Sequence, residues 1–301
     1  MLDSNDTSHI NINDTSKLQP MGVGDILDTT FSLYRRHFLL FMGIASIYFF
    51  AILIEYSLKG FISGTIQKAL IPTLTAIPFA MVSIGGIVLA SATTYLGGNI
   101  TSSAALRQVF QRFFPMLGSH LIWRLVAAIT LMSLMSAMLL MVRQGPFGIL
   151  LAFIGFPVSI YFMICWVFHL PIVLLEEPRV GYALKRSNEL VRGSWWQVFG
   201  MLILIILSSY AIAVIFKVSL GFIFIFAKFA GNTDLRSIIE WSVMEKVLDT
   251  SNFFFYVIMT GSDLILKALV LPIWVIGATI LYFDRRIRKE SPDIEINVAP
   301  T

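Results

Sequence analysis

Six long apolar stretches constrain this chain more than any other feature. They cover roughly residues 38–56, 73–97, 116–142, 147–175, 198–230 and 264–283. A helix of about 20 apolar residues crosses the hydrocarbon core of a bilayer and satisfies its own backbone hydrogen bonds there. Hydrophobic residues make up 57% of the chain and charged residues 13%, whereas a soluble domain carries about 25% charged residues. The sequence therefore predicts an all-α, polytopic membrane protein with about six transmembrane helices.

A basic amphipathic helix is predicted before each pair of spans, over residues 23–38, 101–114 and 179–199. In the last segment the apolar face consists of Ala183, Ser187, Leu190, Val191 and Ser194, and the charged face of Lys185, Arg186, Glu189 and Arg192. Aromatic residues stand at the junctions with the following spans: Phe38, Phe113, Phe114, Trp195 and Trp196. This pattern is typical of helices that lie in the membrane surface, here on the cytoplasmic side. The unit recurs about every 80 residues, through duplication or through independent adaptation to the interface.

Basic residues are distributed unequally between the two ends of the predicted spans. Thirteen Lys and Arg residues fall on the side of both termini, six fall on the opposite side, and three lie within apolar stretches. Because basic loops stay in the cytoplasm, this bias predicts that both termini are cytoplasmic. Residues 1–20 are polar and lack an apolar signal-peptide core, so we expect a disordered cytoplasmic tail. Residues 21–290 then form the six-span membrane domain, and residues 291–301 a second cytoplasmic tail.

Glycine and proline mark where the spans are expected to bend or to pack closely. Gly155, Pro157 and Pro171 interrupt the fourth span and predict a kink. Gly86 and Ala90 in the second span form a small-xxx-small pair, which either packs within the bundle or forms a homodimer face. The fifth stretch exceeds the length of one crossing, so it tilts or ends in an interfacial segment. Residues 231–249 are expected to form the longest outer loop.

No catalytic or cofactor-binding motif stands out, so we predict neither an enzyme nor a cofactor. The chain shows no HExxH, GxSxG, GxGxxG or P-loop pattern. The histidines at 9, 37, 120 and 169 and the single Cys165 do not have metal-ligand spacing. We interpret His169 as a side chain packed in the bundle or at the interface rather than as a ligand.

Four basic residues are the candidate lipid or partner contacts: Arg124, Lys185, Arg186 and Arg192. Arg124 lies about eight residues into the third span, or ~12 Å at 1.5 Å per residue. It either snorkels to the cytoplasmic headgroups or contacts a lipid phosphate or a substrate. The other three belong to the basic helix at 179–199, where each Lys or Arg near an anionic leaflet contributes ~1 kcal/mol of membrane affinity. Clustered charges of this kind suit anionic lipid headgroups better than nucleic acid.

Three other charged residues fall near the predicted outer ends of spans. Glu55, Lys217 and Lys267 are expected to snorkel toward the headgroups. Asp263 has the i, i+4 spacing that allows it to pair with Lys267.

Three segments together resemble a known family: VGDILDTTFSLYRRHF (residues 23–38), ALKRSNELVRGSWWQVFG (183–200) and LYFDRRIRKE (281–290). They resemble the bacterial integral-membrane family related to the membrane domain of glycerophosphoryl diester phosphodiesterases. The resemblance spans about residues 21–290 and implies a six-span domain in the bacterial inner membrane. It does not imply phosphodiesterase activity, because in the fused enzymes the hydrolase is a separate soluble domain.

Two functions follow as hypotheses. The first is a non-catalytic scaffold or accessory module that contacts anionic lipids of the bilayer, a membrane-protein partner or a second copy of the chain. The alternative is a transporter or lipid-handling protein with a site between the spans. Intramembrane carboxylates are few, which argues against ion-coupled transport.

Overall fold

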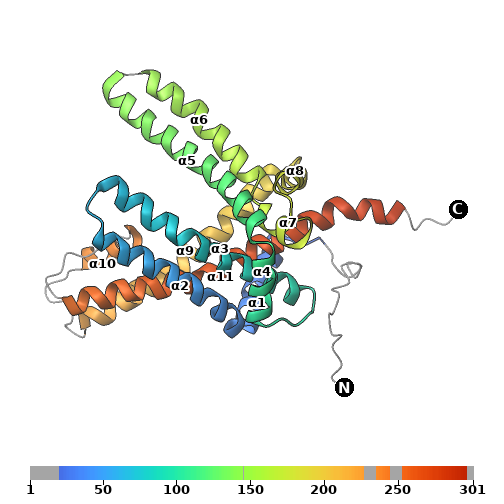
Figure 1. The fold of residues 1–301 in the computed structure, drawn as a ribbon, viewed down its shortest axis with the longest axis horizontal. Coiled ribbons are helices and arrows are strands. Elements are labelled where there is room, and N and C mark those ends of the chain that lie inside the picture. The colour runs from blue at the N-terminus through green and yellow to red at the C-terminus, as the bar shows by residue number, and fades with distance from the viewer. Residues whose placement is uncertain (1–19, 145, 227–234, 245–252, 297–301) are drawn as a thin grey trace.

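The structure, a computed structural model, describes residues 20–144, 146–226, 235–244 and 253–296, and this part of the chain is largely helical (Figure 1). The helices are α1 (Val23–Arg36), α2 (Phe38–Phe61), α3 (Thr65–Tyr95), α4 (Ser102–Gln111), α5 (Phe113–Gln144), α6 (Pro146–Cys165), α7 (His169–Leu175), α8 (Val180–Val191), α9 (Trp195–Phe226), α10 (Leu235–Met244) and α11 (Phe253–Ile296). The all-α class predicted from the sequence is confirmed.

Five helical segments among the described residues are long and apolar enough to cross a membrane. They are Phe38–Leu58, Ile71–Tyr95, Gly155–Leu175, Trp195–Ile223 and Val257–Glu290. The third predicted span falls on α5, whose described apolar part, Phe113–Ile129, is shorter. The described residues are therefore those of a multi-pass membrane protein with five candidate spans, where the sequence predicts six.

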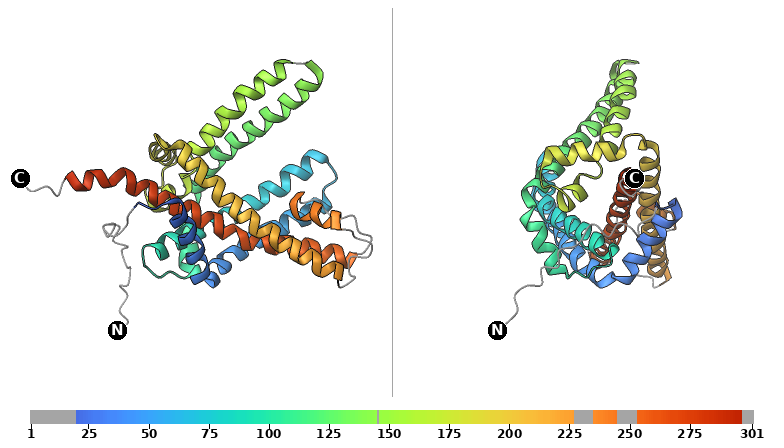
Figure 2. Two further views of the ribbon diagram at one scale, coloured as in Figure 1. Left: turned by 180° about the vertical axis from the view of Figure 1, so that it is seen from behind. Right: turned by 90° about the vertical axis from the view of Figure 1, so that its right-hand side faces the viewer.

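Helix α11 forms the axis of the molecule. It contacts α1, α2, α3, α8 and α9, and in the view along the long axis it lies among the other helices (Figure 2, right). The α5–α6 hairpin leaves this bundle at an angle and contacts it through α3, α7, α8 and α9 (Figures 1 and 2). The end of α11 and helix α1 meet, since the backbone N–H of Met21 donates to Asp284 Oδ1 over 2.9 Å. We call this the base of the molecule.

Small residues allow α2, α3 and α4 to approach closely. A Cβ atom on Gly86 would stand 2.8 Å from Ile44 Cγ2 of α2 and 3.3 Å from Leu106 Cδ2 of α4. Ser83 donates from its hydroxyl to the carbonyl oxygen of Ile44 over 3.0 Å. Ala90 is fully buried. Of the two predicted roles of the Gly86–Ala90 pair, packing within the bundle is therefore the one that the fold realises.

The fourth span is interrupted rather than merely kinked. Helix α6 runs through Pro157 and ends at Cys165, and α7 begins at His169. Ser187 of α8 bonds to both sides of the break: its hydroxyl donates to the Cys165 carbonyl oxygen over 2.8 Å and accepts from the Phe168 N–H over 3.1 Å. In hydrocarbon an unbonded backbone group costs several kcal/mol, so a polar side chain at a break stabilises it.

Two segments differ from the predicted boundaries. Part of the expected outer loop at 231–249 forms helix α10, which packs its Ile238 against Gly221 of α9. Helix α11 continues to Ile296, past the predicted start of the second tail at 291. The predicted tail at 1–20 lies almost wholly outside the described residues, as do residues 297–301.

Candidate functional site

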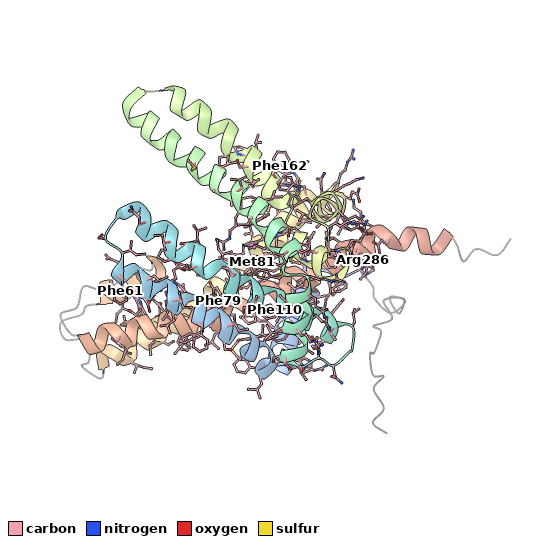
Figure 3. The ribbon with its side chains drawn as sticks, in the orientation of Figure 1. Phe61, Phe79, Met81, Phe110, Phe162 and Arg286 are labelled. Carbon is pink, nitrogen blue, oxygen red and sulfur yellow. The ribbon has the colours of Figure 1, made fainter. Side chains whose placement is uncertain are left out.

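Three groups of polar residues stand out, and the first is an ion-pair network at the base of the molecule. Arg186 of α8 lies 3.5 Å from Glu176 and also pairs with Glu290 of α11. Tyr282 of α11 donates to Glu176 over 2.5 Å. Arg286, which Figure 3 labels at this end of the molecule, pairs with Glu290 over 2.9 Å. The network joins the loop before α8, helix α8 itself and the end of α11.

The carboxylates of this network raise the pKa of Arg186. Burial lowers the pKa of its guanidinium, but Glu176 and Glu290 outweigh that effect and raise the pKa above its ordinary value. Lys185 on α8 and Arg192, the residue directly after α8, are exposed. Of the three basic residues that the sequence singles out on α8, Arg186 is thus committed to internal ion pairs, and the other two face outward.

The carbonyl ends of α7 and α8 are also bonded by basic side chains. Nη1 of Arg112, on the predicted basic helix at 101–114, donates to the carbonyl oxygens of Val173, Leu174 and Glu176 over 2.9–3.1 Å. Lys289 donates to the carbonyl oxygens of Glu189 and Arg192 over 2.6 and 2.7 Å. Such carbonyls have no partner within their own helix, so these two basic residues cap helices.

The second group surrounds Arg124, and we call it the imidazole cluster: His120, Trp123, Arg124 and His169. Arg124 donates from Nε to His120 Nε2 over 2.8 Å. The His120 ring is stacked on His169 of α7, with centroids 5.7 Å apart, and Trp123 lies about the same distance from each imidazole, at 6.0 Å. Both imidazoles are buried, with 6% and 4% of their surface exposed. Two of the scattered histidines therefore meet next to the break in the fourth span.

The third group lines a groove on α11, which we call the α9–α11 groove. It has a volume of about 280 Å³ and is lined by side chains of α2, α9, α10 and α11, among them Ile206, Tyr210, Lys217, Asp263, Lys267 and Trp274. Lys217 Nζ lies 2.9 Å from Asp263 Oδ1 and 5.6 Å from the centre of the Trp241 ring. The Trp241 indole N–H donates to the other Asp263 oxygen over 3.3 Å.

The outer charge Lys217 differs from its predicted behaviour. Lys217 is 5% exposed and pairs with Asp263, so the prediction that it snorkels is wrong. Asp263 thus pairs across helices with Lys217, a partner that the i, i+4 spacing to Lys267 did not suggest. Lys267 Nζ lies 5.9 Å from the centre of the Tyr56 ring of α2. A carboxylate thus lies beside the Lys217 ammonium and an aromatic ring near that of Lys267.

Sequence reasoning found Arg124 but missed the groups that the fold gathers around it and along α11. His120 and His169 are 49 positions apart, and Lys217 and Asp263 are 46 apart. Their type was a signal, since an ionisable residue within a span is a functional hypothesis by default. Among the described residues, no group of three or more His, Cys, Asp or Glu side chains is arranged to hold a metal ion.

Comparison with known proteins adds no further identification. No family model matches the chain, and searches of curated proteins and of solved structures also found no match.

Proposed function

We propose that the chain is a six-span, non-catalytic protein of the bacterial inner membrane, with cytoplasmic termini, that binds a phospholipid in the α9–α11 groove. The resemblance to the bacterial integral-membrane family is part of this proposal. The second and third of its segments meet at the base of the molecule, where Arg186 pairs with Glu290. Met21, two residues before the first segment, donates there to Asp284 of the third.

The gradient of polarity along the groove carries the proposal. The charged residues Lys217, Asp263 and Lys267 lie toward the end of the bundle away from the base, and Ile206 and Trp274 lie nearer the middle of their helices. Lys217 is eleven residues from Ile206, as is Asp263 from Trp274, so the groove extends about 16 Å along both helices at 1.5 Å per residue. This arrangement suits a lipid in the leaflet farther from the base of the molecule. Its headgroup would lie at the charged end of the groove and its acyl chain would point toward the bilayer centre.

The occupant is one acyl chain with its phosphate. A volume of about 280 Å³ lies near the lower limit of small-molecule sites and suits one chain better than a whole lipid. The groove opens sideways, since Ile206, Tyr210 and Trp274 are 60%, 42% and 38% exposed. A lipid can therefore enter from the bilayer. The Lys217 and Lys267 ammonium groups are the donors that a phosphate would meet.

A plug variant tests this function. Ala213 lines the groove, whereas Ala211 on the same helix is exposed and does not line it. Ala213→Phe fills the groove, and Ala211→Phe places the same side chain on the outer surface. We expect native mass spectrometry after delipidation to show one retained phospholipid on the wild type and on Ala211→Phe, and its loss from Ala213→Phe. Equal retention by both variants would refute a lipid site in the groove.

The exposed basic residues of α8 support a second candidate, the scaffold that contacts anionic lipids or a partner. Lys185 and Arg192 face outward, and Trp196, at the start of α9, is 77% exposed. Basic side chains beside an exposed tryptophan suit an anionic leaflet surface. Lys185→Glu with Arg192→Glu is expected to weaken binding to vesicles that contain phosphatidylglycerol and to leave binding to phosphatidylcholine vesicles unchanged. Unchanged binding to both would leave α8 without this role.

A further inference from the structure

In the imidazole cluster, which is separate from the α9–α11 groove, neighbouring groups determine which ring nitrogen of each histidine carries the hydrogen. The Arg124 guanidinium has donors only, so its Nε–H donates to His120 Nε2 over 2.8 Å. His120 Nε2 must therefore hold a lone pair. In a neutral imidazole the hydrogen then lies on Nδ1. Hence the free nitrogen of His120 is a donor.

His169 is assigned in the same way by its own neighbour. Its Nδ1 lies 2.8 Å from the carbonyl oxygen of Trp166, at the break in the fourth span. A carbonyl oxygen only accepts, so Nδ1 carries the hydrogen and donates it. Nε2 of His169 then holds a lone pair. The free nitrogen of this second imidazole is an acceptor.

Both free nitrogens are buried and have no hydrogen-bond partner within the described chain. Leaving a buried polar group unbonded is costly, and nearly all such groups in folded proteins have a partner. One donor and one acceptor stand on two stacked rings whose centroids are 5.7 Å apart. Trp123 forms a wall beside both rings, and its own N–H already donates to the Met163 carbonyl oxygen over 3.1 Å. The two orphan atoms are therefore complementary in hydrogen-bonding character, one a donor and the other an acceptor.

We propose that His120 and His169 bind one hydroxyl group between them. The hydroxyl oxygen accepts from His120 Nδ1–H, and its hydrogen is donated to His169 Nε2. Water and an alcohol, such as the glycerol hydroxyl of a lipid headgroup, share this chemistry. A metal ion does not fit, since it needs a lone pair from each imidazole and the free nitrogen of His120 is a donor. The nearby Arg124 guanidinium also repels a cation.

The two histidines lie next to the break in the fourth span. Span breaks in membrane proteins occur where backbone lines a polar site, and at this break Ser187 bonds to Cys165 and Phe168 while His169 bonds to the Trp166 carbonyl oxygen. Arg124, which holds His120 in its tautomer, is half-buried. It is therefore a positioning residue in this proposal.

Nitrogen-15 NMR of histidine-labelled protein in lipid nanodiscs tests the proposal. Single substitutions at the four histidines assign the spectra, with His37→Gln serving as a control outside the cluster. We expect both His120 and His169 to be neutral and protonated on Nδ1, and the His120 Nδ1–H proton to show a cross-peak to a hydroxyl proton. No coupling should connect His120 Nδ1 with His169 Nε2.

The source of the hydroxyl is resolved by the lipid used. A cross-peak in discs of phosphatidylcholine, which has no headgroup hydroxyl, identifies water. A cross-peak that appears only in phosphatidylglycerol discs identifies the headgroup. A coupling between the two nitrogens would show a direct bond and overturn the proposal, as would protonation of His169 on Nε2 or no cross-peak in either disc.

A second variant checks that the hydroxyl bridges both rings. His169→Phe keeps an aromatic ring and removes the acceptor, so the His120 cross-peak should disappear while the Arg124–His120 contact remains. Persistence of the cross-peak in a variant with unchanged thermal unfolding would show that His120 binds the hydroxyl alone.

Discussion

At the scale of single residues, the sequence counts charges but does not reveal their partners. Arg186 and Lys185 are adjacent in the sequence and equally basic. Yet Arg186 lies between Glu176 and Glu290, whose side chains are 10% and 37% exposed, while Lys185 faces outward. The difference depends on α11, which meets α8 about 100 positions later in the chain. No pattern local to residues 179–199 could have separated the two residues.

A matched pair of substitutions tests this difference. Arg186→Met removes the cation and leaves the nearly buried Glu176 with its tyrosine donor but without its cationic partner, so we expect a loss of about 1–3 kcal/mol in unfolding free energy. Lys185→Met removes an exposed charge and should change it by less than about 0.5 kcal/mol. Thermal unfolding of both variants in the same detergent measures the difference. Equal stabilities would show that the network at the base contributes nothing.

Glycine positions provide a second contrast at this scale. A side chain on Gly86 would collide with Ile44 and Leu106, whereas a Cβ on Gly200 of α9 meets nothing within 4 Å. Gly86→Leu should therefore destabilise the protein by about 1–3 kcal/mol through overpacking. Gly200→Leu makes the same change in helix propensity without the collision. If Gly86→Leu instead abolished a dimer in cross-linking and left monomer stability intact, the homodimer alternative would replace internal packing.

At the scale of elements, the break in the fourth span shows what sequence reasoning can and cannot reach. Pro157 and Pro171 correctly marked this span as irregular, because each removes a backbone donor. The break itself falls at residues 166–168, between the two prolines, and Pro157 stays inside α6. The break lies against Ser187, which periodicity places on the apolar face of its helix. It is buried there, but its hydroxyl bonds to the broken backbone.

Removal of that hydroxyl is the test at this scale. Ser187→Ala leaves the buried Phe168 N–H and the Cys165 carbonyl without their side-chain partner, so we expect a loss of about 1–3 kcal/mol in unfolding free energy. Ser208→Ala is the control, because the exposed Ser208 hydroxyl bonds only to the Leu204 carbonyl of its own helix, over 2.7 Å. Hydrogen exchange should rise at Phe168 in the first variant alone. Unaltered exchange at Phe168 would mean that Ser187 does not hold the break.

At the scale of the whole molecule, periodicity and hydropathy predicted most of the helices and the repeated order of basic helix and hairpin. They could not predict how the helices diverge, since hydropathy makes every apolar face equivalent in lipid. The angle of the α5–α6 hairpin depends on contacts at its base (Figures 1 and 2). The groove and the imidazole cluster arise from the same long-range packing, so the sequence predicts a contact role for Arg124 alone among their residues.

Orientation in the membrane is the property of the whole molecule that the charge bias predicts and that labelling can test. Phe61 is 89% exposed at the end of α2, and Figure 3 shows it at the opposite end of the bundle from Arg286. Lys185 is exposed at the base. Since Cys165 is buried, replacing it with Ala leaves a background for single cysteines at either position. In intact cells an impermeant maleimide should label Phe61→Cys and should label Lys185→Cys only after lysis. The reverse pattern would place the basic face outside, against the rule that basic loops remain in the cytoplasm, and would also move the headgroup end of the α9–α11 groove to the inner leaflet.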